Sequence, residues 1–329
     1  FSDPLPLSDL MASRLDNLSP RHDHTLIYVR DEARVSARWG NGFTLSALAR
    51  QSATLSANKG AARLTQDVAT DGPEPGDYDA NVWLRMRGFA GYGLELGSQG
   101  QWPVAGLKWS AGIQGLQLVR VITRDISGWV HFDATSASYT TRLTSDQFND
   151  HHHYPFQGEA GAQGWAWLAR MEVSGQPRPD WDWRVAVEDI GRLHWSKLAH
   201  EHAVLDTDVA GTDSSGNVVY APLVQGRNSQ DRLNLGTTAT LRAATSWAWQ
   251  PDRAVELELR KYTGVQPMLP YSGVRSDLGG WQLRAGWLWY ERALKLGAEH
   301  GSWQVQAAAD RLDGQARTRA LSVRWQTRW

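Results

Sequence analysis

Polar and apolar side chains alternate with a period of two along most of this chain. In segment 26–39, Val29 and Trp39 lie on an apolar side, whereas Arg30 and Glu32 lie on a charged side. Such alternation places successive side chains on opposite faces of a β-strand. The runs last about 11–15 residues, longer than the 5–6 usual in soluble sheets. The pattern therefore predicts long strands with one apolar and one polar face, and it recurs in segments 43–57, 165–174 and 235–249.

Taken along the whole chain, the alternation predicts an all-β fold, an antiparallel up-and-down barrel of about 14 strands, with 12 or 16 as alternatives. It occupies residues 24–329 and follows a separate N-terminal segment, residues 1–23. The expected strands are 26–39, 43–57, 61–69, 81–97, 102–112, 115–124, 127–140, 162–174, 181–195, 232–249, 253–262, 281–298, 302–312 and 317–329.

The connections between these strands alternate in length. Long connections are expected at one end of the barrel and tight turns at the other, an asymmetry typical of transmembrane barrels. Asp31 interrupts the apolar face of its strand, and a bulge that turns it inward is one explanation. The long connections are 70–80, 140–161, 196–231 and 263–280, and the short ones include 58–60, 98–101, 125–126, 175–180, 250–252 and 299–301.

The N-terminal segment has a different pattern. Leucines within 5–18 are spaced as in a short amphipathic helix, with Ser8 or Asp9 as its cap and Pro20 after its end. This helix could plug the barrel, lie at its rim, bind a periplasmic partner, or simply lead into the first strand.

Composition excludes several classes of protein. The chain has no cysteine, so it has neither disulfides nor cysteine-bound metal clusters. A formal net charge of −1 gives no general attraction to nucleic acid. No apolar run reaches the roughly 18 residues of a spanning helix. The 18 tryptophans fit either a membrane–water interface or a tryptophan-rich soluble β-protein such as a carbohydrate binder.

The last residues carry a family resemblance. Leu321, Val323, Trp325, Thr327 and Trp329 alternate with polar residues, and the sequence stops on an aromatic. This segment resembles the terminal strand of bacterial outer-membrane β-barrel proteins. The resemblance implies an outer-membrane location after removal of a signal peptide, contact with outer-membrane lipid, and recognition of the last strand by the barrel-assembly machinery.

Tryptophans near strand ends predict two aromatic girdles, because Trp concentrates at both edges of a bilayer. A soluble lectin would instead gather its tryptophans in one groove. The girdle candidates are Trp39, Trp102, Trp165, Trp167, Trp181, Trp183, Trp247, Trp249, Trp281, Trp303, Trp325 and Trp329.

The side of the strands opposite the apolar face is expected to line the interior. Arginine outnumbers acid there, which suggests a channel for small or polymeric, mostly anionic solutes. Alternatively the charges pair across strands, and the barrel is a non-conducting scaffold or subunit of an envelope complex. The pore-lining candidates are Arg30, Glu32, Arg34, Arg38, Arg50, Arg85, Arg87, Arg170, Glu172, Arg184, Glu188, Arg242, Glu256, Glu258, Arg260 and Arg284, with Glu95, Lys108, Arg324 and Arg328 in the same pattern.

The predicted loops contain weaker signals. The histidines 151–153 could bind a metal loosely, and the segment 196–231, which contains His200, could form a constriction or bind calcium. A lipid hydrolase at the rim would use Ser196 with His194, or Ser145 with Asp146 and His151, but no nucleophile motif is present. No catalytic residue, cofactor or metal is therefore assigned.

Overall fold

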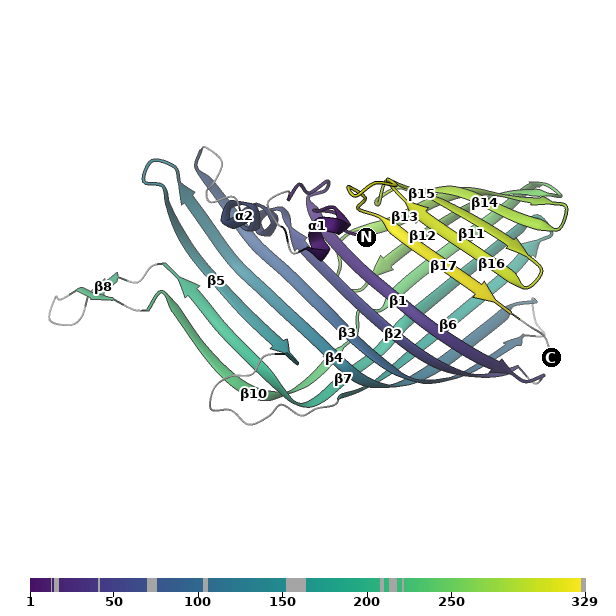
Figure 1. Cartoon of the computed structure of the whole chain (residues 1–329), viewed down its shortest axis with the longest axis horizontal. Coiled ribbons are helices and arrows are strands. Elements are labelled where there is room, and N and C mark those ends of the chain that lie inside the picture. The colour runs from purple at the N-terminus through teal and green to yellow at the C-terminus, as the bar shows by residue number, and fades with distance from the viewer. Residues whose placement is uncertain are drawn as a thin grey trace.

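The computed structural model describes the chain with the exception of residues 13, 15–17, 41, 70–75, 103–105, 152–163, 208–209, 213–217, 221 and 327–329. The fold is all-β: one antiparallel sheet of 15 strands curls into a barrel, as Figure 1 shows. None of the helices in the described part of the chain is long and apolar enough to span a membrane.

Most strands pair with their neighbours in sequence. Thirteen of the 15 strands follow one another around the barrel wall, and we call each of these places a wall position; β6 and β10 share wall positions with other strands. The first strands are β1 (His24–Arg38), β2 (Phe43–Asn58), β3 (Tyr78–Gln101), β4 (Lys108–Asp133), β5 (Ser138–Asn149), β6 (Gly164–Arg178) and β7 (Trp181–Asp206). After a small hairpin, β8 (Ala210–Thr212) and β9 (Val218–Tyr220), come β10 (Val224–Gly236), β11 (Thr240–Gln250), β12 (Arg253–Tyr262), β13 (Met268–Leu278), β14 (Trp281–Leu288), β15 (Ala293–His300), β16 (Trp303–Ala309) and β17 (Arg319–Trp325).

Two wall positions are each shared by two strands. β5 and β6 both lie between β4 and β7, β5 against one half of each neighbour and β6 against the other. Likewise β10 and β11 pair with successive parts of β7. Each pair therefore acts as one wall strand with an interruption.

The N-terminal segment joins the two ends of the sheet. With thirteen antiparallel positions, β1 and β17 run in the same direction, and no ladder pairs them among the described residues. Ser2 forms an antiparallel bridge with Ile27, and its N–H donates to the carbonyl of Arg317 at 2.8 Å. Residues 1–3 thus supply a short strand of opposite direction between the two ends.

Only part of the predicted N-terminal helix forms. Helix α1 spans Leu7–Met11, with Pro6 at its N-cap and no side-chain cap. Neither expected cap residue takes that role, and the Ser8 hydroxyl donates instead to the carbonyl of Gly314. The helix begins at Leu7, after residues that are held in the wall, and it ends at Met11, well before the predicted end.

The predicted strand 61–69 is wrong, because this segment forms helix α2 (Lys59–Ala69). The Asn58 side chain accepts a hydrogen bond from the N–H of Ala61 at 3.0 Å, as N-cap residues do. Ala61 and Leu64 then pack with Tyr78, Val82 and Phe132 on β3 and β4.

Several predicted boundaries also differ from the structure. No turn occurs at 125–126 or between 112 and 115, because β4 is continuous over 26 residues. Residues of the predicted loop 196–231 lie in β7 and β10, and part of 140–161 lies in β5. The long predicted strand 281–298 is two strands, β14 and β15, joined by a turn at 289–292.

The asymmetry of the connections is present in the structure. At one end, strands are joined by short connections: 39–42, 102–107, 179–180, 251–252, 279–280 and 301–302. At the other end lie the longest ones, 59–77 with α2 and 207–223 with β8 and β9. We refer to these as the short-turn end and the long-loop end.

An outward apolar band encircles the barrel beside the short-turn end. Ten of the described tryptophans lie at that end: Trp39, Trp102, Trp109, Trp181, Trp183, Trp247, Trp249, Trp281, Trp303 and Trp325. The sequence pattern predicts Trp39 and Trp281 near strand ends at the opposite end of the barrel, and for these two residues that prediction is wrong. Trp165, Trp167, Trp287 and Trp289 lie farther along their strands, and all four are exposed. Trp329 lies outside the described residues.

Polar residues mark the far edge of this band. Asp31 faces outward without any bulge and accepts a hydrogen bond from Gln51 on the adjacent strand. Arg120 and Arg192 are exposed on the same outer face. Between the tryptophans and these polar residues lie roughly ten strand residues, the length that a tilted transmembrane strand needs.

The strands β3, β4 and β7 have 24, 26 and 26 residues and continue well past the band. Their far parts, together with β5 and much of β10, form an extension toward the long-loop end, clear in Figure 1 as the long sheet on the left. The extension comprises residues 78–90, 120–133, 138–149, 196–206 and 224–233, and α2 packs on its outer face.

Candidate functional site

The barrel interior is the candidate site, since charged side chains from many strands meet there. Of the sixteen pore-lining candidates, every one except Arg38 makes an ion pair with another charged side chain. Arg85 and Arg87 do so in the extension, where both contact Asp125.

A pair of contacts crosses the interior from β1 and β2 to β7. The Arg50 guanidinium donates two hydrogen bonds to the Asp189 carboxylate, at 2.7 and 2.9 Å. Beside them, Arg30 donates to Glu188 at 2.8 Å. The Arg50 side chain is fully buried. These transverse contacts divide the interior into a first compartment, enclosed by β2–β7, and a second, enclosed by β11–β16.

Asp189 reaches this position because of its backbone. Its φ of +63° is unusual for a residue other than glycine. The register of β6 and β7 shifts here, so that two consecutive side chains, Glu188 and Asp189, both face inward. The alternation pattern placed only Glu188 inward, and Asp189 was missed.

The first compartment contains a charge-balanced network around Glu95. Its carboxylate accepts hydrogen bonds from Arg34 at 2.7 Å and from Arg170 at 2.8 Å. Gln114 donates to its other oxygen at 2.7 Å. Glu95 is almost completely buried, and its lone pairs are well used.

Between this network and the long-loop end, the first compartment is lined by apolar side chains. The prediction of a charged interior is therefore wrong in this part of the barrel. Leu116 and Leu118 follow Gln114 on the inward side of β4. They pack with Leu48, Leu168, Leu193, Trp195 and Leu233, among others. In these segments both faces of the strand are apolar. This pattern is visible in the sequence and indicates an apolar interior, but the prediction of interior residues considered only charged positions.

The second compartment has a different charge balance. Glu258 lies 3.3 Å from Arg242 and 3.6 Å from Arg260. Glu256 lies 3.9 Å from Arg275 and 3.5 Å from Arg284. Each of these glutamates is thus shared by two arginines.

An aromatic ring lies flat against the wall of this compartment. Tyr271 covers Gly273 and Gly286, where an added Cβ would come within 2.2 and 2.4 Å of the tyrosine side chain. The Lys295 ammonium lies 5.0 Å from the centre of the same ring. Neither Lys295 nor Arg275 was among the predicted interior residues. Arg275 lies in segment 263–280, which was wrongly predicted as a connection and contains β13, and Lys295 follows the turn at 289–292, where the alternation is interrupted.

A histidine links three strands on the inner face of the extension, beyond the apolar band. His200 contacts Asp231 at 2.7 Å and Asp146 at 3.1 Å, and its ring stacks on Phe148 at 4.1 Å. Partial burial lowers the pKa of His200, but the two carboxylates outweigh burial and raise it above the ordinary value of 6.5.

In the described part of the chain, no contact joins the residues proposed for a hydrolase. Asp146 contacts His200 and His202, whereas His151 lies beside Asp150. His194 packs on Trp165 at 5.2 Å. No group of three metal-binding side chains is present in the described part of the chain, and His152 and His153 lie outside it.

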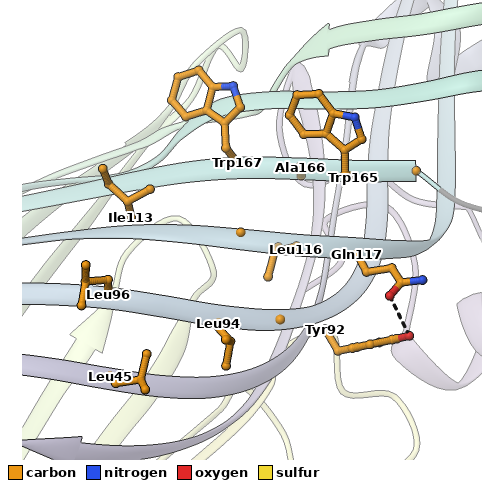
Figure 2. Close-up of a pocket in the computed structure, with 13 residues that line it drawn as sticks. Leu45, Tyr92, Leu94, Leu96, Ile113, Leu116, Gln117, Trp165, Ala166 and Trp167 are labelled. Carbon is orange, nitrogen blue, oxygen red and sulfur yellow. Dashed lines mark hydrogen bonds between the residues drawn. The ribbon is translucent and has the colours of Figure 1, made fainter.

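The outer wall also has a shallow groove, within the apolar band on β2, β3, β4 and β6. Figure 2 shows Leu94, Ile113 and Trp167 projecting from the strands. Gly115 also lines the groove, and a Cβ added there would meet nothing within 4 Å. At one end the Tyr92 hydroxyl donates to Gln117 at 3.1 Å, the dashed line in Figure 2. The groove has an almost wholly apolar lining, consistent with an outer face adapted to hydrocarbon.

Comparisons with known proteins add little. No family model matches the chain, and no curated protein matches it. Among solved structures, the chain is similar to the CymD monoaromatic hydrocarbon channel, with 12% sequence identity, 94% of this chain and 88% of that chain covered, and a TM-score of 0.35. At this level of similarity the solute of that channel says nothing about the solute of this protein.

Proposed function

We propose that this protein is an outer-membrane β-barrel channel that passes small anionic solutes through its second compartment. The observation that carries the proposal is the surplus of cations there. Glu256 and Glu258 face Arg242, Arg260, Arg275, Arg284 and Lys295. Rings of arginine and lysine are a means by which pores favour anions.

The membrane location is supported by the outer face. An exposed apolar band of about ten residues along β1, β4 and β7 matches the hydrocarbon thickness of a bilayer. Tryptophans cluster at one edge of the band, and the connections are short at that same end. Outer-membrane barrels combine these two features, with the short turns on the periplasmic side.

The test is conductance of the refolded protein in planar bilayers under a potassium chloride gradient. We expect stepwise currents whose reversal potential lies closer to the equilibrium potential of chloride than to that of potassium. Replacing Arg242 and Arg284 by Gln should move the reversal potential toward zero. Arg34→Gln is the matched control, because it removes one interior arginine from the charge-balanced network, where Glu95 retains Arg170.

A second function is favoured by the transverse contacts and the apolar cluster, which fill much of the first compartment. In this alternative the barrel conducts nothing and serves as a scaffold or subunit of an envelope complex, with residues 1–23 as a contact surface. Absence of current from folded protein, together with co-purification of a partner, would support it over the channel. We propose no enzymatic activity for either case.

A further inference from the structure

We infer that the second compartment contains a specific binding site for a doubly charged oxyanion, centred on Arg260. The inference rests on the proposed channel for the route by which the anion arrives. Binding itself can be measured on protein in detergent, where conduction plays no part.

The first observation is that like charges are placed directly opposite each other. Arg242 on β11 pairs in register with Arg260 on β12, and Arg275 on β13 pairs with Arg284 on β14. Like charges at directly opposed positions destabilise a sheet. Glu258 is shared by the first pair and Glu256 by the second, so these resident carboxylates offset part of the repulsion.

The resident carboxylates offset it incompletely. Five cations line this compartment, and the carboxylates within 4 Å of them are those of Glu256, Glu258 and Glu299. Lys295 makes no salt bridge with a described residue, and its ammonium lies over Tyr271 instead. The compartment therefore retains about two positive charges, which an anion of charge −2 would balance.

The second observation is a set of unused donors. The Nε–H groups of Arg242, Arg260 and Arg284 are buried and make no hydrogen bond with any described residue. For Arg242 and Arg284 a glutamate oxygen lies 3.3 and 3.5 Å away, but outside hydrogen-bonding geometry. Buried donors of a charged group rarely remain unused, so three in one compartment indicate a missing acceptor.

The chemistry of the donors defines the ligand class. Guanidinium groups present paired donors in a plane, which match the oxygens of phosphate and carboxylate groups. The side chains of Arg242 and Arg260 are 31% and 18% exposed, so a ligand in the lumen can reach part of each side chain, and it reaches the buried Nε–H groups only after these side chains turn. Hydrogen phosphate and small dicarboxylates share the required charge and oxygens.

The test is binding to the refolded full chain in a zwitterionic detergent at low salt. Inorganic phosphate is titrated by calorimetry and by ³¹P line broadening, and succinate is titrated as a second arm. We expect saturable binding of one anion per chain, weaker for chloride. Tighter binding of phosphate or of succinate would identify which source of oxyanion the site favours.

Arg260→Gln should weaken binding about tenfold to a hundredfold, the effect of losing a charged hydrogen bond. Lys295→Met provides a second variant in case the first fails to fold, and Arg34→Gln should bind like the parent. Equal weakening in Arg34→Gln, or no saturable binding by the folded parent, would overturn the inference. Anion-selective current without saturable binding would support the proposed channel and contradict the proposed binding site.

Discussion

Arg50 on β2 and Asp189 on β7 face each other across the barrel interior and share two hydrogen bonds, at 2.7 and 2.9 Å. They come from wall positions separated by three others, β3, β4 and the position of β5 and β6. The pair therefore spans the interior between distant parts of the wall and occupies space that a solute would otherwise use.

Breaking this pair from one side should be costly. Arg50→Gln or Asp189→Asn alone leaves a buried charge without its partner, and we expect a loss of about 3–5 kcal/mol in the free energy of unfolding. The double variant should lose less than the sum of the two. Urea unfolding in micelles measures this double-mutant cycle. Additive losses would show that the two side chains do not interact in solution.

The N-terminal segment can be located by cross-linking. The chain has no cysteine, so introduced pairs form disulfides without competition. Ser2→Cys combined with Ile27→Cys should cross-link rapidly on oxidation, since these residues are bridged across neighbouring strands. Gel mobility without reductant reports the bond. Ser2→Cys with Thr54→Cys is the control, and equal cross-linking of that pair would contradict the position of residues 1–3.

The extension should respond to pH through His200. Because its folded pKa is raised above 6.5, protonated His200 stabilises the contacts of β5, β7 and β10. This stability is fully present below the unfolded pKa and is lost as pH rises through the folded pKa. Limited proteolysis of the extension should therefore accelerate as the pH rises above about 6.5.

His200→Gln removes this titrating group and should make proteolysis independent of pH over the same interval. His300 lies at the short-turn end, stacked on Trp281, and provides a matched control. A pH response that survives in His200→Gln, or disappears in His300→Gln, would assign the effect to another group.

The flat position of Tyr271 should depend on Gly286. An alanine there would place its Cβ 2.4 Å from the ring and 2.6 Å from the carbonyl of Ser272. We expect Gly286→Ala to destabilise the barrel by about 1–3 kcal/mol through overpacking. Gly236→Ala, which meets nothing within 4 Å, is the control. Thermal unfolding monitored by circular dichroism distinguishes the two.

Alternation was a good guide where a strand was regular. It placed Arg30, Arg34 and Glu188 on one face of their strands, because side-chain direction follows sequence parity as long as no residue is inserted. It failed at Asp189, where the left-handed backbone and the shift in register reverse the parity.

Other features depend on contacts that no local pattern reveals. Segment 61–69 is short enough to fit either a strand or a helix, and its packing on β3 decides for the helix. The segment 125–126 was predicted as a turn, yet it lies within β4, where Asp125 belongs to the polar inner face of the extension and pairs with Arg87. The separation into two compartments follows from pairings between distant strands, which the sequence does not show.

The odd number of wall positions has a consequence for the order of events during folding. Most ladders join strands close in sequence and can form by the successive addition of hairpins. Closure instead requires residues 1–3 to meet residues 316–317, a contact spanning 314 positions between Asp3 and Arg317. Its entropic cost must be met before it contributes any stability. We therefore expect closure to be the slow final step, and until then the barrel exists as an open sheet with two unpaired edges.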